Sequence, residues 1–322
     1  MEKPLKVTIQ SPNPERLDKA LHKALPHLSR RHLRRLIEQG SVYLNNKRVR
    51  KQSKMLIPSQ VYTVQIYDYD GSDIDALARE VCWEDRILYR DNHLLAVNKP
   101  AGIPSAPTRE SAVHNLYAYL KKAGILDTTY FPFHRLDKGT TGVLLIPLSR
   151  LMTRELNRQM QQNRIQKVYF ALVEGVPEKA TWTIEGYMAP PRGIQQPAKF
   201  SRTQQPGYLY ARTEFVAEQT SPNHHVSLVR ILPQTGRTHQ IRLHLQISRL
   251  PVLGDTIYRS GASPRITVPH LMLHCFEMQF YHPLLRKALS ICAPLPAEWV
   301  HLSRLLFPDF DDRFSRLQTP TP

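Results

Sequence analysis

Residues 133–150, FHRLDKGTTGVLLIPLSR, join a polar loop to an apolar strand and decide how the centre of this chain folds. The loop carries His134, Arg135 and Asp137, and the apolar run begins at Val143. A strand end is a rigid support, so a loop on it can hold a charged side chain over a cleft. The two glycines of the loop permit tight turns or the close approach of a ligand. Taken alone, an aspartate in a loop is more often a turn former than a catalyst.

A second segment, QKVYFALVEG at residues 166–175, alternates as strands do. Alternation places Lys167 and Tyr169 on one face and Val168 and Phe170 on the other. The pattern therefore predicts a strand that presents a lysine and a tyrosine together.

A third segment, QTGRTHQIRLHL at residues 234–245, combines a glycine turn with a helical run. We expect Thr238 to cap this helix. The helix would then present Arg237, His239 and Arg242.

The surrounding chain contains several short β-type runs: ILYRDNHLLAVNKP, GVLLIPLS, KVYFALVEG and HHVSLVRILP. One helix is expected after Ser149, where Leu151, Met152, Leu156 and Met160 recur at helical spacing. Because the strands are not each followed by a helix, the pattern favours an α+β fold with a mixed, largely antiparallel sheet over a doubly wound parallel one.

Together, HRLDKGTTG, KVYFALVEG and TGRTHQIRLH resemble the RluA-type pseudouridine synthase family in order and spacing. AVNKPAGIP upstream and LGDTIY and LMLHC downstream extend the likeness over roughly residues 81–300. The resemblance implies that the chain isomerises uridine to pseudouridine in RNA and that it has a pseudouridine-synthase-like fold.

The resemblance also implies roles for single residues. Asp137 would be the catalytic aspartate, and Arg242 would pair with it and keep it ionised at neutral pH. Tyr169 would stack on the target base and assist a proton transfer. Arg135 would insert where the flipped nucleotide had stacked. Further RNA-binding candidates in the same segments are His134, Lys167, Arg237 and His239; Lys167 and Arg237 could equally satisfy local acids or carbonyls.

Two departures from the family pattern stand out. The family usually has Thr-Ser-Gly where this chain has Thr140-Thr141-Gly142, and the second threonine keeps the hydroxyl. The family commonly has Gly-His-Pro where this chain has Arg249-Leu250-Pro251. The second change affects the expected substrate contacts and leaves the catalytic set intact.

Pseudouridine formation needs a carboxylate, a surface that retains the detached base, and exclusion of water. It needs no cofactor, and the chain contains no G-x-G-x-x-G, no P-loop and no metal-type spacing of His or Cys. We therefore expect neither cofactor nor metal. The nearest approach to a ligand cluster is a set of histidines that we expect to be structural or RNA-facing: His239, His244, His270 and His274.

The charge of the chain indicates a polyanionic partner. Lys and Arg number 44 against 27 acids, a formal net charge of +17 over 322 residues. Such an excess is typical of proteins that neutralise phosphates, although it also occurs on surfaces that are merely solvated. The odd number of cysteines, without C-x-x-C spacing, favours a reducing compartment. No signal-peptide pattern or bilayer-length apolar run is present, so we expect a cytoplasmic monomer without membrane contact.

The basic residues concentrate near the N-terminus. Residues 15–26 predict one helix, Ser29 can cap a second over residues 30–39, and Gly40 suits its left-handed C-terminal cap. A hairpin around Asn45-Asn46 should follow. Between residues 29 and 54 there are nine Lys or Arg residues and one acid, Glu38.

This order resembles the S-four-type RNA-binding module, which implies structured RNA as the partner. We expect the following residues to bind RNA: Arg31, Arg34 and Arg35. The expected domains are the RNA-binding module at 14–66, a linker at 67–80, the catalytic domain at 81–310 and a tail at 311–322.

The sequence thus predicts a site-specific RNA pseudouridine synthase that acts on ribosomal RNA of the large subunit. Transfer RNA is the alternative substrate. Two other classes stay open: a non-catalytic RNA-binding or ribosome-assembly factor that retains the fold, and a hydrolase that cleaves the same glycosidic bond.

Overall fold

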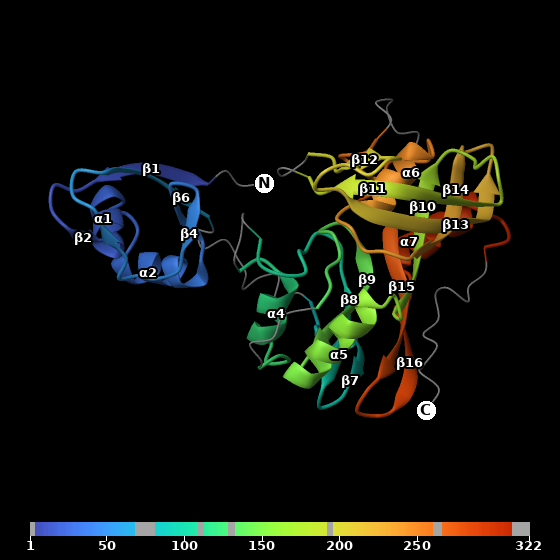
Figure 1. Cartoon of the computed structure of the whole chain (residues 1–322), viewed down its shortest axis with the longest axis horizontal. Coiled ribbons are helices and arrows are strands. Elements are labelled where there is room, and N and C mark those ends of the chain that lie inside the picture. Colours follow the sequence, from blue (N-terminus) through green and yellow to red (C-terminus); the bar gives the residue numbers. More distant parts are fainter. Residues whose placement is uncertain are drawn as a thin grey trace. The chain divides into compact units, whose positions relative to one another are not determined.

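The computed structural model describes residues 4–67, 81–108, 113–127, 133–191, 196–259 and 266–310. The chain divides into two compact units, which are described separately (Figure 1). The first comprises Met1–Glu84 with Ala106–Asp127, and the second comprises Asp85–Ser105 with Thr128–Pro322. Residues 68–80 of the expected linker and the expected tail at 311–322 lie outside the described residues.

The first unit packs two helices, α1 (Leu17–Ala24) and α2 (Arg30–Gln39), with a small antiparallel sheet. The strand order is β1 (Leu5–Gln10), β6 (Val61–Ile66), β3 (Val42–Leu44) and β4 (Lys47–Val49). Strands β2 (Glu15–Arg16) and β5 (Met55–Leu56) pair with each other and form a separate two-stranded sheet. Helix α4 (Leu116–Lys122) clusters with this unit, and its Tyr119 stacks on Trp83.

The local signals of this unit are confirmed. The Ser29 side chain accepts a hydrogen bond from the backbone N–H of His32, and Gly40 ends α2 in the left-handed region at φ 83°. The hairpin turn has φ of 48° at Asn45 and 63° at Asn46, as a two-residue turn of the expected kind requires. Two helices followed by a hairpin are therefore what the chain forms.

The second unit contains one large mixed sheet. Its strand order is β12 (Lys199–Ser201), β11 (Thr181–Ala189), β13 (Leu209–Ser221), β14 (Val226–Pro233), β10 (Gln166–Glu174), β15 (Leu273–His282), β9 (Thr141–Pro147), β8 (Leu94–Lys99) and β7 (Ile87–Arg90). Strand β16 (Lys287–Cys292) also pairs with β15. Among the described pairings only β9 with β15 is parallel, so the prediction of a mixed, largely antiparallel α+β fold is confirmed.

Strand β9 is buried along its whole length, because β8 and β15 flank it in the sheet. Helix α5 (Arg150–Gln161) follows directly after Ser149, as expected, and contacts β9; the Ser149 side chain caps it by accepting from the N–H of Met152. It buries Met152 and Leu156, whereas Leu151 is exposed. Gly142, at φ 106°, lies so close to β15 that a side chain there would collide with the backbone of Cys275.

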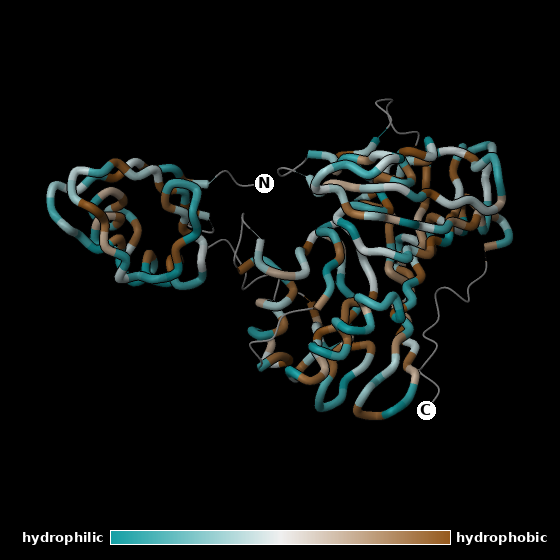
Figure 2. Tube along the Cα trace, viewed as in Figure 1, coloured by the Kyte–Doolittle hydropathy of each residue, from teal (hydrophilic) through white to brown (hydrophobic). Residues whose placement is uncertain are grey.

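Short elements complete the second unit: α6 (Gln240–Ile247), α7 (Ala297–Leu306) and a 3-10 turn at Glu84–Arg86 where the two units meet in sequence. Figure 2 shows hydrophobic stretches along many strands, and hydrophilic stretches in turns and on helices such as α2 and α5. Within the described parts of the chain, no helix has the length and apolarity to cross a membrane.

Candidate active site

The loop that carries Asp137 is tied down on both sides by the segment that follows β8. The Ser105 hydroxyl donates to the carbonyl of Leu136 at 2.9 Å and accepts from its N–H at 3.0 Å. The carbonyl of Lys138 accepts from the N–H of Gly102 at 2.9 Å. Because the residues before and after Asp137 are both bonded, the backbone at Asp137 has little freedom.

Lys99, the last residue of β8, adds a buried basic side chain to this arrangement. Its Nζ donates to the carbonyls of Pro100 and Ile103, both at 2.8 Å, and of Lys138 at 3.2 Å. Burial lowers the pKa of Lys99 to about 7, while the Asp137 carboxylate acts in the opposite direction. The buried side chain of Lys99 therefore stabilises the loop that carries Asp137, through its bond to the Lys138 carbonyl.

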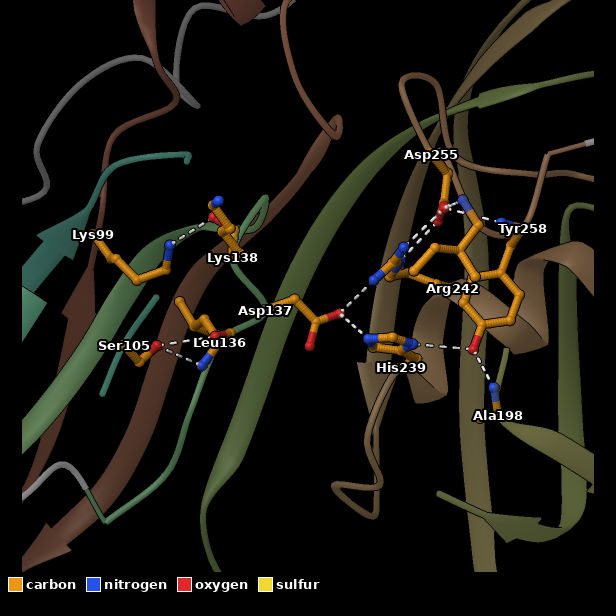
Figure 3. Close-up of polar contacts among 11 residues, drawn as sticks. Lys99, Ser105, Leu136, Asp137, Lys138, Ala198, His239, Arg242, Asp255 and Tyr258 are labelled. Carbon is orange, nitrogen blue, oxygen red and sulfur yellow. Dashed lines mark hydrogen bonds and ion pairs between the residues drawn. The ribbon is translucent and has the colours of Figure 1, made fainter. Parts of the chain in front are cut away.

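Arg242, on α6, approaches Asp137 from the other side. Its Nη1 lies 3.0 Å from Asp137 Oδ2. Its Nε and Nη2 donate to the two oxygens of Asp255 at 2.7 and 2.8 Å, a bidentate pair. Figure 3 shows Asp137 turned toward Arg242, with Lys99 and Lys138 on its far side. The structure thus brings together two predicted residues, and one guanidinium serves two carboxylates.

The three charged groups differ in access to solvent. The Asp137 side chain is 27% exposed, whereas Arg242 is 8% and Asp255 0% exposed. Burial opposes the charge on Arg242, but Asp255 and Asp137 outweigh it and raise the pKa of the guanidinium. Burial likewise opposes the charge on Asp255, but Arg242 and two backbone N–H groups lower the pKa of that carboxyl. Both buried partners are ionised, and Asp137 is the accessible member.

Asp255 had been given no role from the sequence. Its Oδ1 also accepts from the N–H groups of Ile257 at 2.8 Å and Tyr258 at 3.0 Å, so the turn itself orients the carboxylate. The available signal was that it is the one charged residue in LPVLGDTIY, residues 250–258. A buried acid in such a segment needs a cation, and Arg242 is that cation.

Tyr169, on β10, is buried and close enough to Asp137 to respond to its charge. Burial, the neighbouring Cys275 and the Asp137 carboxylate raise the pKa of the phenol far above its usual value. The pairing of β10 with β15 shifts at this point, since Val168 lies opposite Glu277 and Tyr169 opposite Cys275. Tyr169 therefore presents a neutral phenol to the site.

The expected cap at Thr238 is wrong. The residue before α6 is His239, at φ 60° and ψ 19°, and no side chain caps through it. Instead, Gln240 Oε1 accepts from the N–H of Arg237 at 2.9 Å and from the hydroxyl of Thr235 at 2.8 Å. The left-handed turn at His239 starts the helix one residue later than expected and directs the imidazole toward Asp137, with Nε2 3.9 Å from Oδ2.

The remaining candidates of this unit lie in different environments. His134 Nε2 accepts from the N–H of Leu145 at 3.0 Å, and burial and Lys167 lower the pKa of its ring to about 3. Burial and the charge of Arg237 lower the pKa of Lys167. His134 thus ties the loop to β9.

The two arginines differ in access to solvent. Arg237 Nε donates to the carbonyl of Tyr210 at 2.9 Å, whereas Arg135 is exposed. Arg135 is the most accessible of the four candidates.

The three arginines predicted on α2 are not equivalent. Arg31 and Arg35 are exposed. Arg34 Nε lies 2.7 Å from Asp18 Oδ2, and this buried carboxylate also bonds Arg30 at 3.1 Å and Arg16 at 2.9 Å. Part of the basic cluster is therefore compensated within the first unit.

Within the described residues, no group of three or more His, Cys, Asp or Glu side chains is arranged to hold a metal ion. The histidines considered from the sequence bond to protein groups instead. His244 Nδ1 lies 3.0 Å from the Thr213 hydroxyl, and His270 Nε2 lies 2.8 Å from Glu298. His274 bonds the Thr141 hydroxyl and the carbonyl of Ala293.

Two family models match the chain. One, described as RNA pseudouridylate synthase, matches residues 93–247, and the other, the S4 domain, matches residues 15–61. The first covers Asp137, Tyr169 and Arg242, and the second covers the predicted helices and hairpin.

Known proteins resemble most of the chain. A ribosomal large subunit pseudouridine synthase C of Vibrio vulnificus is 28% identical over 87% of this chain and 89% of its own length. A tRNA pseudouridine synthase C of Haemophilus ducreyi is 32% identical over 71% of this chain and 97% of its own length. The solved structure of human RNA pseudouridylate synthase domain containing 4 covers 72% of this chain and 95% of its own, with a TM-score of 0.57 and 23% identity, and shows the fold.

The resemblance inferred from the three central segments is therefore confirmed over nearly the whole length of these relatives. Asp137, Tyr169 and Arg242 all lie inside the matched region. This chain belongs to the RNA pseudouridine synthase family.

Proposed function

We propose that this chain converts uridine to pseudouridine at chosen sites in structured RNA, and that its substrate is ribosomal RNA of the large subunit. Membership of the family supports the reaction. The S4 domain and the large-subunit synthase from Vibrio vulnificus support docking on a large folded RNA. The relative from Haemophilus ducreyi makes transfer RNA the second candidate substrate.

The observation that carries the proposal is the ion pair of Asp137 with Arg242, 3.0 Å long, in which only the carboxylate is accessible. In the reaction, the N1–C1′ bond breaks, the uracil turns, C5 bonds to C1′, and the C5 proton moves to solvent and N1 regains one. An ionised carboxylate can attack the sugar or the base, or assist the detachment. Arg242 keeps Asp137 oriented, and the two bonds that Arg242 donates to Asp255 keep the guanidinium in place.

The substrate uridine must leave its stack to reach Asp137, which costs a few kcal/mol. Arg135 is exposed on the same loop as Asp137, and it would fill the space left by the extruded nucleotide. Tyr169, as a neutral phenol, would stack on the uracil and could donate a hydrogen bond to it. Phosphate contacts by Arg31 and Arg35, with Arg237 near the site, would offset the extrusion cost, whereas the buried Lys167 is less suited to bind phosphate.

The test is release of tritium from RNA labelled at C5 of uridine. Asp137→Asn keeps the shape of the side chain and removes its charge, so turnover should fall at least about a thousandfold. Asp85→Asn, which changes an exposed acid, is the matched control and should act as the unaltered chain does. Tritium release that persists in Asp137→Asn would contradict the assignment.

The same reaction separates the other classes of protein. A non-catalytic assembly factor would release no tritium from any RNA while still binding it. A hydrolase would leave free uracil among the products, whereas an isomerase leaves the base attached to the RNA.

The substrate is decided by mapping pseudouridines in cells that lack the gene. Loss of a site in large-subunit ribosomal RNA is expected; unchanged ribosomal RNA with a lost site in transfer RNA would favour the alternative. The proposal includes a cytoplasmic location, with which the free thiols of Cys82, Cys275 and Cys292 agree. It also includes a monomeric state, which sedimentation of the purified chain would test.

A further inference from the structure

His239 occupies an unusual place between Asp137 and Tyr258 (Figure 3). Its Nε2 lies 3.9 Å from Asp137 Oδ2, and its Nδ1 lies 3.1 Å from the Tyr258 hydroxyl. The two rings meet edge to face, with centroids 5.6 Å apart and planes at 90°. The backbone of His239 is left-handed, a strained conformation for a residue other than glycine, and strain of this kind gathers at functional sites.

The hydrogen bonds of Tyr258 determine which nitrogen of His239 carries the proton. The backbone N–H of Ala198 can only donate, and it lies 2.7 Å from the Tyr258 oxygen. That oxygen already accepts one bond, and His239 Nδ1 is the acceptor within reach of its own proton, so donation to Nδ1 satisfies both groups. A neutral imidazole that accepts at Nδ1 carries its proton on Nε2.

The surrounding charges lead to the same tautomer. An ionised Asp137 only accepts hydrogen bonds, so it favours an N–H over a lone pair on the facing Nε2. Burial and the charge of Arg242 lower the pKa of His239, and the charges of Asp137 and Asp255 oppose this decrease without cancelling it. The ring is therefore neutral at neutral pH. Burial raises the pKa of Tyr258, so the phenol keeps the proton that it donates.

We propose that Tyr258 is a positioning residue that holds His239 as the neutral Nε2–H tautomer, with this N–H directed at the Asp137 carboxylate as a donor during the isomerisation. No proton is transferred in this role. Arg242, in the first turn of α6, supplies one charged donor to Asp137, and His239, the residue before α6, supplies a neutral donor. A neutral donor orients the carboxylate without adding a second charged hydrogen-bond donor to it. The role rests on the proposed function of Asp137.

The tautomer itself is measured on the full chain by nitrogen NMR of labelled histidine, with the His239 signals identified by their loss in His239→Gln. We expect a protonated Nε2 and an unprotonated, hydrogen-bonded Nδ1. Tyr258→Phe keeps the ring that covers Arg242 but removes the donor, so the preference should disappear or reverse. Tyr89→Phe is the matched control, because it removes the hydroxyl of a tyrosine on β7, the last strand in the sheet order, where that hydroxyl donates to Asp91.

A protonated Nδ1 in the unaltered chain would overturn the proposal. A spectrum that Tyr258→Phe leaves unchanged would overturn it as well. Turnover adds a second readout: Tyr258→Phe should lower kcat about tenfold while KM changes less than about twofold.

Two substitutions at position 239 separate the donor from the fold. The amide nitrogen of a glutamine can reach the place of Nε2, whereas that of an asparagine reaches only the place of Nδ1. His239→Gln should therefore keep kcat within about tenfold, and His239→Asn should lose about a hundredfold. Stability should follow the opposite order, because asparagine tolerates the left-handed backbone better.

Equal kcat values for the two variants, or a faster His239→Asn, would show that no donor at the Nε2 position is used. Absence of turnover in the unaltered chain would count against the proposed function alone, since the nitrogen spectra decide the tautomer without it.

Discussion

Asp137 lies near two buried basic side chains that act in different ways. Arg242 bonds the carboxylate directly and is itself held by Asp255. Lys99 bonds backbone carbonyls, including that of Lys138, and so acts on the loop rather than on the side chain. Arg242 therefore orients the Asp137 carboxylate, and Lys99 shapes the turn that presents it.

This division predicts the effect of Lys99→Met. Methionine fills a similar volume but leaves the carbonyls of Pro100, Ile103 and Lys138 without the ammonium donor. The free energy of unfolding should fall by about 2–4 kcal/mol, measured by urea unfolding of the second unit.

Lys138→Met is the control, because that side chain is exposed and only its carbonyl is used. It should change the free energy of unfolding by less than about 0.5 kcal/mol. Equal losses in the two variants would mean that Lys99 does not support the loop.

Helices α1 and α2 are joined by a single buried carboxylate. Asp18 on α1 is 0% exposed and bonds Arg30 and Arg34 on α2 as well as Arg16. Burial opposes its charge, but the hydrogen bonds from Arg34, Arg16 and Arg30 prevail and lower the pKa of Asp18 to about 2. The charge of Asp18 thus stabilises the packing of the two helices and partly neutralises the basic face.

A pH dependence follows from this lowered pKa. The folded unit holds Asp18 ionised more strongly than the unfolded chain does, so the stabilisation is complete above about pH 4 and is lost as the pH falls toward 2. A decrease from the usual value of 3.8 to about 2 corresponds to about 2 kcal/mol. Amide exchange in α1 and α2 of the full chain should show protection that declines over this range.

Asp18→Asn should already have lost that protection at neutral pH and should change little between pH 4 and 2. Glu38→Gln, on the exposed side of α2, is the matched control and should keep the pH dependence. A full pH dependence in Asp18→Asn would assign the acid sensitivity to another group.

Over the whole molecule, the positive charges that can bind phosphate are those that no neighbouring carboxylate compensates. Arg34 is partly compensated by Asp18, whereas Arg31 and Arg35 on the same helix are exposed. We therefore expect Arg31 and Arg35 to contribute more to phosphate binding than Arg34, although the three were indistinguishable in the sequence.

The double variant Arg31→Ser, Arg35→Ser should weaken binding to full-length RNA and lower the slope of log K against log salt by about 1–2. Turnover of a short RNA that is already bound should change less than about twofold, because the catalytic unit is unaltered. Binding is measured by titration at several salt concentrations.

Arg286→Ser, Lys287→Ser removes the same net charge from an exposed turn of the second unit and is the matched control. Its salt slope should stay close to that of the unaltered chain. If the two double variants lower the slope equally, net charge rather than the first unit governs RNA binding.

Local patterns were enough for much of the fold. The cap at Ser29, the left-handed Gly40 and the Asn45-Asn46 turn involve groups a few residues apart, and all were predictable. The cap at Thr238 was predicted by the same rule and was wrong, because Gln240 bonds back over the turn and His239 takes a left-handed conformation.

The sequence by itself determined the family, the two helices and the hairpin of the first unit, and the strands of the central segments, since motifs, caps and periodicity lie in neighbouring residues. Only the tertiary structure decided that Asp255 holds Arg242, that Lys99 supports the loop, and that His239 faces Asp137. Lys99 and Lys138, whose carbonyl it bonds, are 39 residues apart in the chain. Contacts over such separations depend on how the sheet brings strand ends together, and no local pattern encodes the partner of a buried charge.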